Sequence, residues 1–232
     1  MTSNIILPGE IIQTFGKIAH RKADLDSDAA SGKYKALRSG LMIHSSPQLL
    51  KFDPLASQYI PSLDDKVVGL INRKTLESYE LDIKASRKAV LGSLEFEEAT
   101  KKNKPDLYAG DIVFSRVKDI DKYLPIELTC TSHVNKKGWS SGEAQFGKLS
   151  GGMEITVPLF FSRYLLFNEE MFEFIRKRID FEVCVGINGV IWVKTRNHKN
   201  LVLLNSFFAK AAYIGRNKAM EMLYGYADQF EA

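Results

Sequence analysis

Cysteine and histidine are scarce in this chain, whose 232 residues include two cysteines and four histidines. So few cysteines exclude a disulfide-stapled scaffold and favour a reducing compartment. Cys130 and His133 have the spacing of half a zinc site, but a structural zinc ion needs four ligands. Because only Cys184 and three other histidines remain, we expect no metal and interpret Cys130 as a buried thiol near a loop histidine.

Long apolar runs are also absent. No uninterrupted apolar stretch reaches the ~18 residues that indicate a membrane-spanning helix. The first residues, Met1 to Ile5, lack the basic segment and following apolar stretch of a secretory signal. We therefore expect an intracellular, soluble protein that contacts no membrane.

An excess of charge of one sign is missing from every part of the chain. The net charge is +4 and the isoelectric point is about 8.9. Lys and Arg outnumber Asp and Glu by 7 to 5 in residues 1–60, by 15 to 14 in residues 61–150 and by 10 to 9 in residues 151–232. Such a small excess is weak evidence for a polyanionic partner. Any contact with nucleic acid must come from local clusters of basic residues.

Complete catalytic motifs are lacking. Residues 142–148 match a phosphate-binding P-loop up to its lysine, but Leu149 stands where Ser or Thr would bind Mg²⁺. This segment does not follow an apolar strand, and no cluster of Asp and Glu indicates a two-metal nuclease site. We expect no catalytic residues and no cofactor.

The first 60 residues are predicted to form a small β-rich domain. Residues 41–43 and 49–52 have the apolar character of short strands. The stretch from His20 to Lys35 is polar and has no apolar periodicity, which is typical of a loop or a disordered insertion.

Residues 61–150 are predicted to form a small closed barrel, because five short strands separated by turn residues fit an OB-fold. A helical or 3₁₀ turn is expected at residues 96–100, between the third and fourth strands, where OB-folds often place an element that plugs the barrel. The Gly- and Ser-rich residues 132–152 are interpreted as a linker with turns. The predicted strands are residues 66–72, 78–83, 89–91, 111–117 and 126–131.

The second of these strands alternates with a period of two. Tyr79, Leu81 and Ile83 fall on one face, and Glu80 and Asp82 fall on the other. Tyr79 could stack on a base, as aromatic residues of OB-folds do. Its pattern with its two apolar neighbours favours core packing instead.

Residues 151–232 are predicted to form a KH-like domain, because the elements follow the order β-α-α-β-β-α. Asn188-Gly189 lies between two strand-like runs and indicates a tight hairpin in which both residues take positive φ. The predicted elements are a strand at 153–157, helices at 158–168 and 169–179, strands at 181–186 and 190–194, and helices at 198–213 and 217–230.

The predicted fold class is therefore mainly β plus α/β. We expect three domains: an N-terminal β-rich module at residues 1–60, a five-stranded S1-type OB barrel at residues 61–150, and a KH-like domain with a C-terminal helix at residues 151–232.

Several motifs resemble one protein family. Residues 67–71 with 77–83 resemble the opening of an S1-type OB-fold, and Ala-Thr-Lys-Lys-Asn-Lys-Pro at residues 99–105 resembles the exosome cap subunit family called ribosomal RNA-processing protein "forty". Gly-Ile-Asn-Gly at residues 186–189 is similar to the Gly-Xaa-Asn-Gly motif of exosome cap subunits. The resemblance runs from about residue 59 to 195.

This resemblance implies a non-catalytic, RNA-binding cap subunit of the RNA exosome. Such a subunit stabilises a ring of RNase PH-like proteins, meets other cap subunits, and guides RNA into the central channel towards a separate 3′-to-5′ exonuclease. It implies processing and degradation of rRNA, mRNA and other RNAs in the nucleus, nucleolus and cytoplasm. Two alternatives remain, namely a stand-alone RNA-binding regulator of translation or turnover, and a nuclease in its own right.

Two groups of lysines are the candidate RNA-binding residues. Lys101, Lys102 and Lys104 form a compact basic loop, and each can neutralise a phosphate without reading sequence. Alternatively they are a solvated face beside an acidic segment. Lys136 and Lys137, in the next long loop, are a weaker candidate that an ordinary linker would also explain.

The KH-like region lacks the loop that grips RNA in a KH domain. That Gly-Xaa-Xaa-Gly loop joins the first two helices, and here residues 167–170 contain no glycine and two carboxylates. We expect no standard RNA clamp at this position. Gly186, Asn188 and Gly189 are predicted to form a tight turn that packs against the OB-fold.

Overall fold

The computed structural model divides the chain into two compact units, Met1–Ser57 and Gln58–Ala232. The boundaries of the three predicted domains stay a prediction. The structure describes residues 4–6, 11–13, 17–19, 25–28, 33–37, 40–46, 49–54, 58–134, 136–141, 143–167, 169–214, 216–226 and 230.

The first unit contains two small sheets. One has the strand order β1-β6-β7-β3 and the other has the order β2-β5-β4. A small apolar core of Ile18, Leu25, Ala36 and Phe52 is buried in this unit. The strands are β1 (Asn4–Ile6), β2 (Ile11–Gln13), β3 (Lys17–Ala19), β4 (Leu25–Asp28), β5 (Lys33–Ala36), β6 (Gly40–Ser46) and β7 (Leu49–Pro54).

The prediction of a loop from residue 20 to 35 is wrong where β4 and β5 lie. These strands pair antiparallel with each other, and Leu25 and Ala36 are almost completely buried. Both strands are only four residues long and mostly polar, so the segment shows no apolar periodicity in the sequence. The other residues of this stretch lie outside the described part of the chain.

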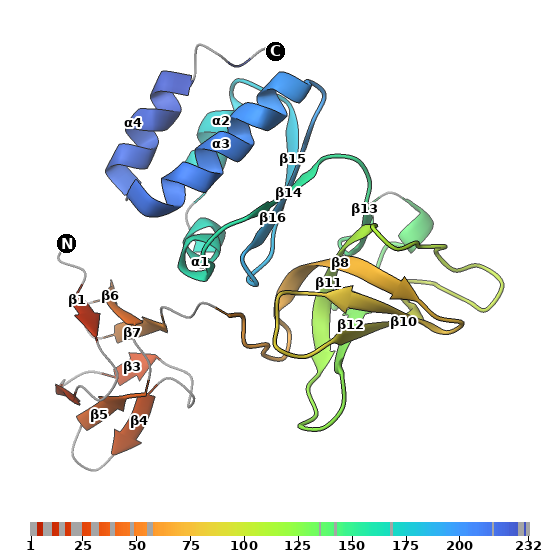
Figure 1. Cartoon of the computed structure of the whole chain (residues 1–232), viewed down its shortest axis with the longest axis horizontal. Helices are drawn as coiled ribbons and strands as arrows, with labels where there is room; N and C mark the ends of the chain where they lie inside the picture. Colours follow the sequence, from red (N-terminus) through yellow and green to blue (C-terminus); the bar gives the residue numbers. More distant parts are fainter. Residues whose placement is uncertain are drawn as a thin grey trace. The chain divides into compact units, whose positions relative to one another are not determined.

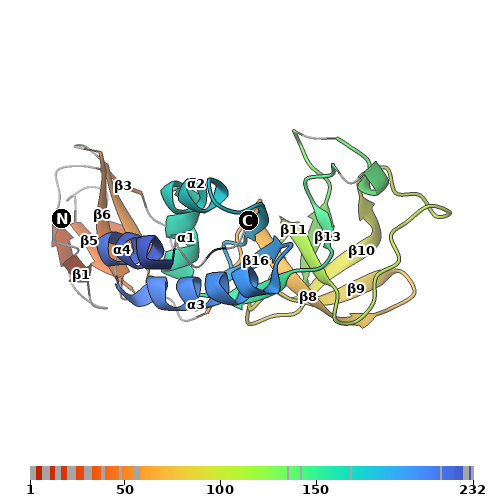
Figure 2. The same cartoon turned by 90° about the horizontal axis from the view of Figure 1, so that it is seen from above.

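The second unit begins with the predicted five-stranded barrel. Its strands pair in the order β12-β10-β9-β8-β11, and a further pairing between β11 and β12 closes the barrel. The pair of β10 and β12 is parallel, and the other pairs are antiparallel. Figure 2 shows these strands curving around the barrel. They are β8 (Lys66–Lys74), β9 (Ser78–Asp82), β10 (Ala89–Phe96), β11 (Ile112–Asp119) and β12 (Ile126–Cys130).

The barrel interior follows the alternation read from the sequence. Tyr79, Leu81 and Ile83 are each at most 2% exposed, whereas Glu80 and Asp82 are half-buried. The Tyr79 hydroxyl donates a hydrogen bond of 2.8 Å to the Pro105 carbonyl. The interpretation of Tyr79 as a core residue is therefore confirmed.

Two details of the barrel differ from the prediction. Residues 96–100 form a turn rather than a helical plug, with a hydrogen bond from Ala99 N–H to the Phe96 carbonyl and Glu98 at a φ of 61°. The expected linker at 132–152 contains the 3₁₀-helix η1 (Trp139–Ser141) and the strand β13 (Gly147–Leu149), which pairs antiparallel with β11. The sequence does not indicate this strand because its three residues, which begin with Gly147, are too few to show an apolar alternation.

The KH-like domain has the predicted β-α-α-β-β-α order. Its sheet has the strand order β14-β16-β15, and both pairs are antiparallel. In Figure 1, α2 and α3 lie on the same side of this sheet. The elements are β14 (Met153–Thr156), α1 (Leu159–Phe167), α2 (Glu170–Arg176), β15 (Phe181–Val185), β16 (Val190–Thr195), α3 (His198–Ile214) and the additional α4 (Arg216–Tyr226).

An aromatic-rich core holds this domain together. Ile191 and Val193 of the central strand and Phe207 and Phe208 of α3 are completely buried. The Phe207 and Phe208 rings meet edge to face, 5.2 Å apart, a favoured geometry for aromatic pairs. The expected combination of β-rich module, OB barrel and KH-like domain is thus confirmed. Across the described residues, every helix falls short of the length and apolar character needed to traverse a bilayer.

Candidate RNA interface

The first lysine group stands at the tip of a closed turn between β10 and β11. The backbone N–H of Thr100 donates to the Asn103 carbonyl at 2.8 Å, and the Asn103 N–H donates back to Thr100 at 3.2 Å. The Thr100 hydroxyl also accepts from the Asn103 N–H at 3.1 Å. Lys101 and Lys102 occupy the two positions between these residues and are exposed. The turn therefore presents two ammonium groups side by side to solvent.

The loop that follows is anchored to the barrel. Pro105 is buried, and its carbonyl accepts the hydrogen bond from Tyr79. Leu107 is 1% exposed. The Lys104 ammonium lies 3.3 Å from the Ser93 hydroxyl of β10 and donates to it. These contacts hold the lysine turn in one place on the barrel, so its charge is presented at little entropic cost.

The neighbouring carboxylates do not neutralise this turn. Glu97 accepts a hydrogen bond from the Ser132 N–H at 3.2 Å, and Glu95 pairs with Lys118 at 2.6 Å. Within the described part of the chain, Lys101 and Lys102 have no ion-pair partner. Two of the three carboxylates beside the loop, Glu95 and Glu97, thus contact other groups, which favours a binding surface over a mutually paired, solvated face.

The second lysine group is tied to the same region. Lys136 and Lys137 are exposed, and Lys137 forms an ion pair with Glu143. Shortly after them, the N–H of Trp139 donates to the Glu97 carbonyl at 3.1 Å. This bond joins the loop of the second lysine group to the turn that precedes the first one. The two groups predicted from the sequence therefore lie on adjoining loops.

The outward face of β9 is acidic and suits RNA poorly. Glu80 forms ion pairs with Arg73 at 2.6 Å and with Lys88 at 3.5 Å. The hydrogen bond from Arg73 lowers the pKa of the Glu80 carboxyl. Asp82 pairs with Lys84 at 3.4 Å. Because this face carries carboxylates and its cations are already paired, it is an unfavourable surface for phosphates.

A cluster that no sequence pattern indicates fixes the far arm of the lysine loop. Lys74, in β8, forms an ion pair with Asp106 and lies 4.8 Å above the Tyr108 ring. The Tyr108 hydroxyl donates to Asp106 at 2.5 Å. The hydrogen bond with Asp106 raises the pKa of Lys74, and that from Lys74 lowers the pKa of Asp106. Lys74 and Asp106 are 32 residues apart, so no local pattern could pair them.

The Gly-Ile-Asn-Gly loop joins the barrel to the KH-like domain. β9 ends at Asp82, opposite Leu70, so the preceding edge of β8 has no strand beside it. The Asn188 amide fills this edge: its Nδ2 donates to the carbonyls of Val68 at 2.8 Å and Ile83 at 3.0 Å. Its Oδ1 accepts from the Val68 N–H at 3.2 Å. Asn188 is 2% exposed. Its three hydrogen bonds satisfy three buried backbone groups of the barrel.

Backbone contacts continue this junction. The Ile187 N–H donates to the Lys66 carbonyl at 2.9 Å. Gly189 has a φ of 80°, but Asn188 is not in the positive-φ region, so the predicted turn with two positive φ angles is wrong. The loop has four residues between β15 and β16. The Asn188 side chain forms its hydrogen bonds with the barrel instead of with the backbone of its own turn.

Gly186 leaves no room for a side chain. A Cβ at this position would overlap the Asn188 amide oxygen and lie 2.8 Å from the Val68 nitrogen. We predict that Gly186→Ala lowers the free energy of unfolding by about 2 kcal/mol or more, because the loop must withdraw from the barrel. Urea denaturation checks this.

A second glycine provides the control for this substitution. Gly225 lies in α4 with open space around it. Gly225→Ala should be neutral or stabilise by up to ~1 kcal/mol through helix propensity. Equal effects of the two substitutions would mean that the close approach at Gly186 is not formed.

The position of the usual KH clamp is occupied by acidic residues. α1 ends at Phe167 and α2 begins at Glu170. Glu169 and Glu170 are exposed at this junction. Two carboxylates without a glycine do not make a phosphate-binding loop. The described residues of this junction agree with the expectation that the KH-like domain does not grip RNA in the standard way, which stays a prediction.

The enzymatic alternatives find no support in the geometry. Lys148, the lysine of the partial P-loop, lies in β13 and pairs with Asp111 at 2.8 Å, and Gly142 lies outside the described residues. Cys130 is buried and donates to the Phe114 carbonyl, whereas His133 is exposed. Among the residues that the structure describes, no group of three or more His, Cys, Asp or Glu could hold a metal ion.

Both cysteines are free thiols with unfavourable conditions for ionisation. Burial raises the pKa of Cys130 far above its usual range and that of Cys184 to about 11. At pH 8 only about one Cys184 thiol in a thousand is then ionised, and the thiolate is the reactive form. We predict that iodoacetamide labels both cysteines slowly in the folded protein and quickly in urea, as read by mass spectrometry. Fast labelling of folded Cys130 would contradict its burial.

Comparisons with known proteins identify both domains of the second unit. The family model described as "Exosome complex component RRP40, S1 domain" matches residues 59–142, and a KH domain model matches residues 152–199. A crystal structure described as an exosome complex RNA-binding protein superimposes with a TM-score of 0.59 at 18% identity, covering 75% of this chain and all of that one. At that identity the likeness concerns the fold.

Relatives extend over most of the chain. It is 32% identical over 212 residues to exosome complex component RRP40 of Drosophila melanogaster, covering 88% of this chain and 87% of that protein. It is 36% identical over 159 residues to RRP40 of Saccharomyces cerevisiae, covering 67% and 64% of the two chains. The resemblance seen in the sequence is confirmed, and the chain belongs to the RRP40 family of exosome complex components.

Proposed function

We propose that this protein is a non-catalytic, RNA-binding cap subunit of the RNA exosome. In this role it contacts RNase PH-like ring subunits and other cap subunits and stabilises the ring. It guides RNA into the central channel towards an associated 3′-to-5′ exonuclease that processes and degrades rRNA, mRNA and other RNAs. The complex would act in the nucleus, the nucleolus and the cytoplasm.

The lysine turn carries the RNA-binding part of this proposal. Lys101 and Lys102 are exposed at the tip of a hydrogen-bonded turn, and neither has an ion-pair partner among the described residues. Lysine ammonium groups neutralise phosphates and release counterions whatever the base sequence. A subunit that guides many different RNAs needs this kind of contact, because a base-specific site would hold some sequences and exclude others.

The junction through Asn188 supports a scaffolding role. A buried side chain that satisfies three backbone groups of another domain fixes the two domains against each other. A cap that stabilises a ring gains from such rigidity, because less conformational freedom is lost when it binds its neighbours. The acidic α1–α2 junction leaves the barrel as the part of the chain that faces RNA.

Affinity purification of the chain from its own cells tests this proposal. Ring subunits of the RNase PH type and a 3′-to-5′ exonuclease should co-purify with it in stoichiometric amounts, as measured by native mass spectrometry. The recombinant chain alone, incubated with labelled RNA and Mg²⁺, should leave the RNA intact. Recovery of the chain alone would favour a stand-alone regulator, and cleavage by the pure chain would favour a nuclease.

A further inference from the structure

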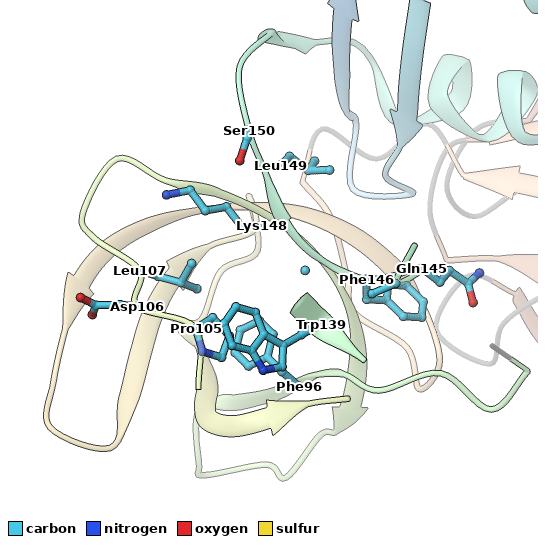
Figure 3. Close-up of a pocket in the computed structure, with 12 residues that line it drawn as sticks. Phe96, Pro105, Asp106, Leu107, Trp139, Gln145, Phe146, Lys148, Leu149 and Ser150 are labelled. Carbon is cyan, nitrogen blue, oxygen red and sulfur yellow. The ribbon is translucent and has the colours of Figure 1, made fainter. Parts of the chain in front are cut away.

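A cavity of about 320 Å³ lies beside the lysine loop, and its lining is shown in Figure 3. This volume is at the lower end of the range of small-molecule sites. Much of the wall is aromatic or apolar, and these residues come from the end of β10, the arm of the lysine loop, η1 and the position just before β13. These lining residues are Phe96, Pro105, Leu107, Trp139 and Phe146.

The cavity lies where the two lysine groups adjoin. Pro105 directly follows Lys104, and Trp139 comes two residues after Lys137. The backbone N–H of Trp139 donates a hydrogen bond of 3.1 Å to the Glu97 carbonyl, and this bond holds the two loops together. A strand whose phosphates lie on these lysines therefore passes the opening of an aromatic cavity.

The polar lining suits a base better than a phosphate. Asp106 lines the cavity, and the hydrogen bond from Lys74 lowers the pKa of its carboxyl, so it is charged at neutral pH. A carboxylate repels a phosphate but accepts hydrogen bonds from the N–H groups of a base edge. Lys148 also lines the cavity and gives one N–H to Asp111, which leaves two further donors for the oxygens of a base.

We propose that this cavity takes one unstacked base of a single-stranded RNA, with the Trp139 indole as a stacking surface. This inference rests on the proposed function, because the lysine groups must hold the backbone for a base to reach the cavity. Stacking on an aromatic ring tolerates every base, since all bases have a π-face. The cavity would therefore retain RNA without selecting a sequence.

RNA binding by the full chain separates the base contact from the phosphate contact. Fluorescence anisotropy at low salt would compare a short labelled oligouridylate with an abasic strand of the same length and charge. We expect the protein to bind the oligouridylate at least about fivefold more tightly, as one stacked base contributes. Trp139→Ala should reduce the affinity for oligouridylate to that for the abasic strand and leave the latter unchanged. Trp139→Phe, which retains a ring, should keep most of the preference.

The abasic strand also reports on folding, because a misfolded variant would lose affinity for both strands. Equal affinities of the unchanged protein for the two strands would overturn the base cavity and leave the phosphate-binding lysines intact. An undiminished preference in Trp139→Ala would also overturn the base cavity, because the base would then be bound elsewhere on the protein. Failure of the unchanged protein to bind either strand would instead contradict the proposed function on which the inference rests.

Discussion

Asn188→Asp is expected to destabilise the protein more than any other single substitution considered. It replaces Nδ2, which donates to the carbonyls of Val68 and Ile83, by a carboxylate oxygen that faces both of them. Asn188→Ala leaves the same groups unpaired, at about 1–3 kcal/mol each, so its cost is about 3 kcal/mol or more. The aspartate should cost more still, because an unpaired charge is then buried. Urea denaturation at neutral pH measures both effects.

The pH dependence distinguishes these two variants. Burial next to two carbonyl oxygens raises the pKa of the introduced Asp above its unfolded value of ~3.9. Between these two pKa values the folded state binds more protons than the unfolded state. The stability of Asn188→Asp therefore falls as the pH rises from ~3.9 through the raised pKa of the folded state. The difference from Asn188→Ala should shrink towards pH 4 and be largest at neutral pH.

An exposed asparagine gives the matched control. Asn72→Asp introduces the same charge on β8, where the side chain is exposed, and should change stability by less than about 0.5 kcal/mol. If Asn72→Asp and Asn188→Asp had equal effects, the bridge between barrel and KH-like domain would not exist as described.

Removing the charge of the lysine turn is expected to have the largest effect on RNA binding. In the variant Lys101→Gln, Lys102→Gln, Lys104→Gln, each lost phosphate contact should lower the slope of log affinity against log salt by ~0.7. The slope should therefore fall by about 2 in total. Affinity at low salt should fall by about tenfold or more. Anisotropy titrations with single-stranded RNA at several salt concentrations measure both quantities.

A second triple variant controls for the change in net charge. Lys122, Lys177 and Lys210 are exposed and distant along the chain from the lysine turn. Their replacement by Gln removes the same charge and should leave the salt slope nearly unchanged. If both triple variants lost the same amount of slope in log affinity against log salt, the phosphate contacts would not be confined to the lysine turn.

Local sequence patterns were sufficient for most of the second unit. The alternation of Tyr79, Leu81 and Ile83 predicted the buried face of β9, because a strand places every second side chain inward. The order of the KH-like elements followed from changes between strand and helix periodicity. The lysine turn was visible because its three cations lie within four residues of one another.

The features that the sequence did not reveal depend on distant partners or on very short strands. Asn188 indicated a tight turn, but its hydrogen bonds to Val68 lie 120 residues away along the chain. β4 and β13 have four and three residues, too few to show a period. The pair of Lys74 and Asp106 was likewise beyond local patterns, because surface charges pair according to the fold.

The most direct test is to cross-link RNA to the complex purified from cells and to identify the attached peptides by mass spectrometry. Single-stranded RNA containing 4-thiouridine, irradiated in the assembled complex, should attach to peptides that include residues 101–104. Attachment at Glu169 and Glu170, with none at residues 101–104, would show that the KH-like domain binds the RNA and would contradict the lysine turn as its guide.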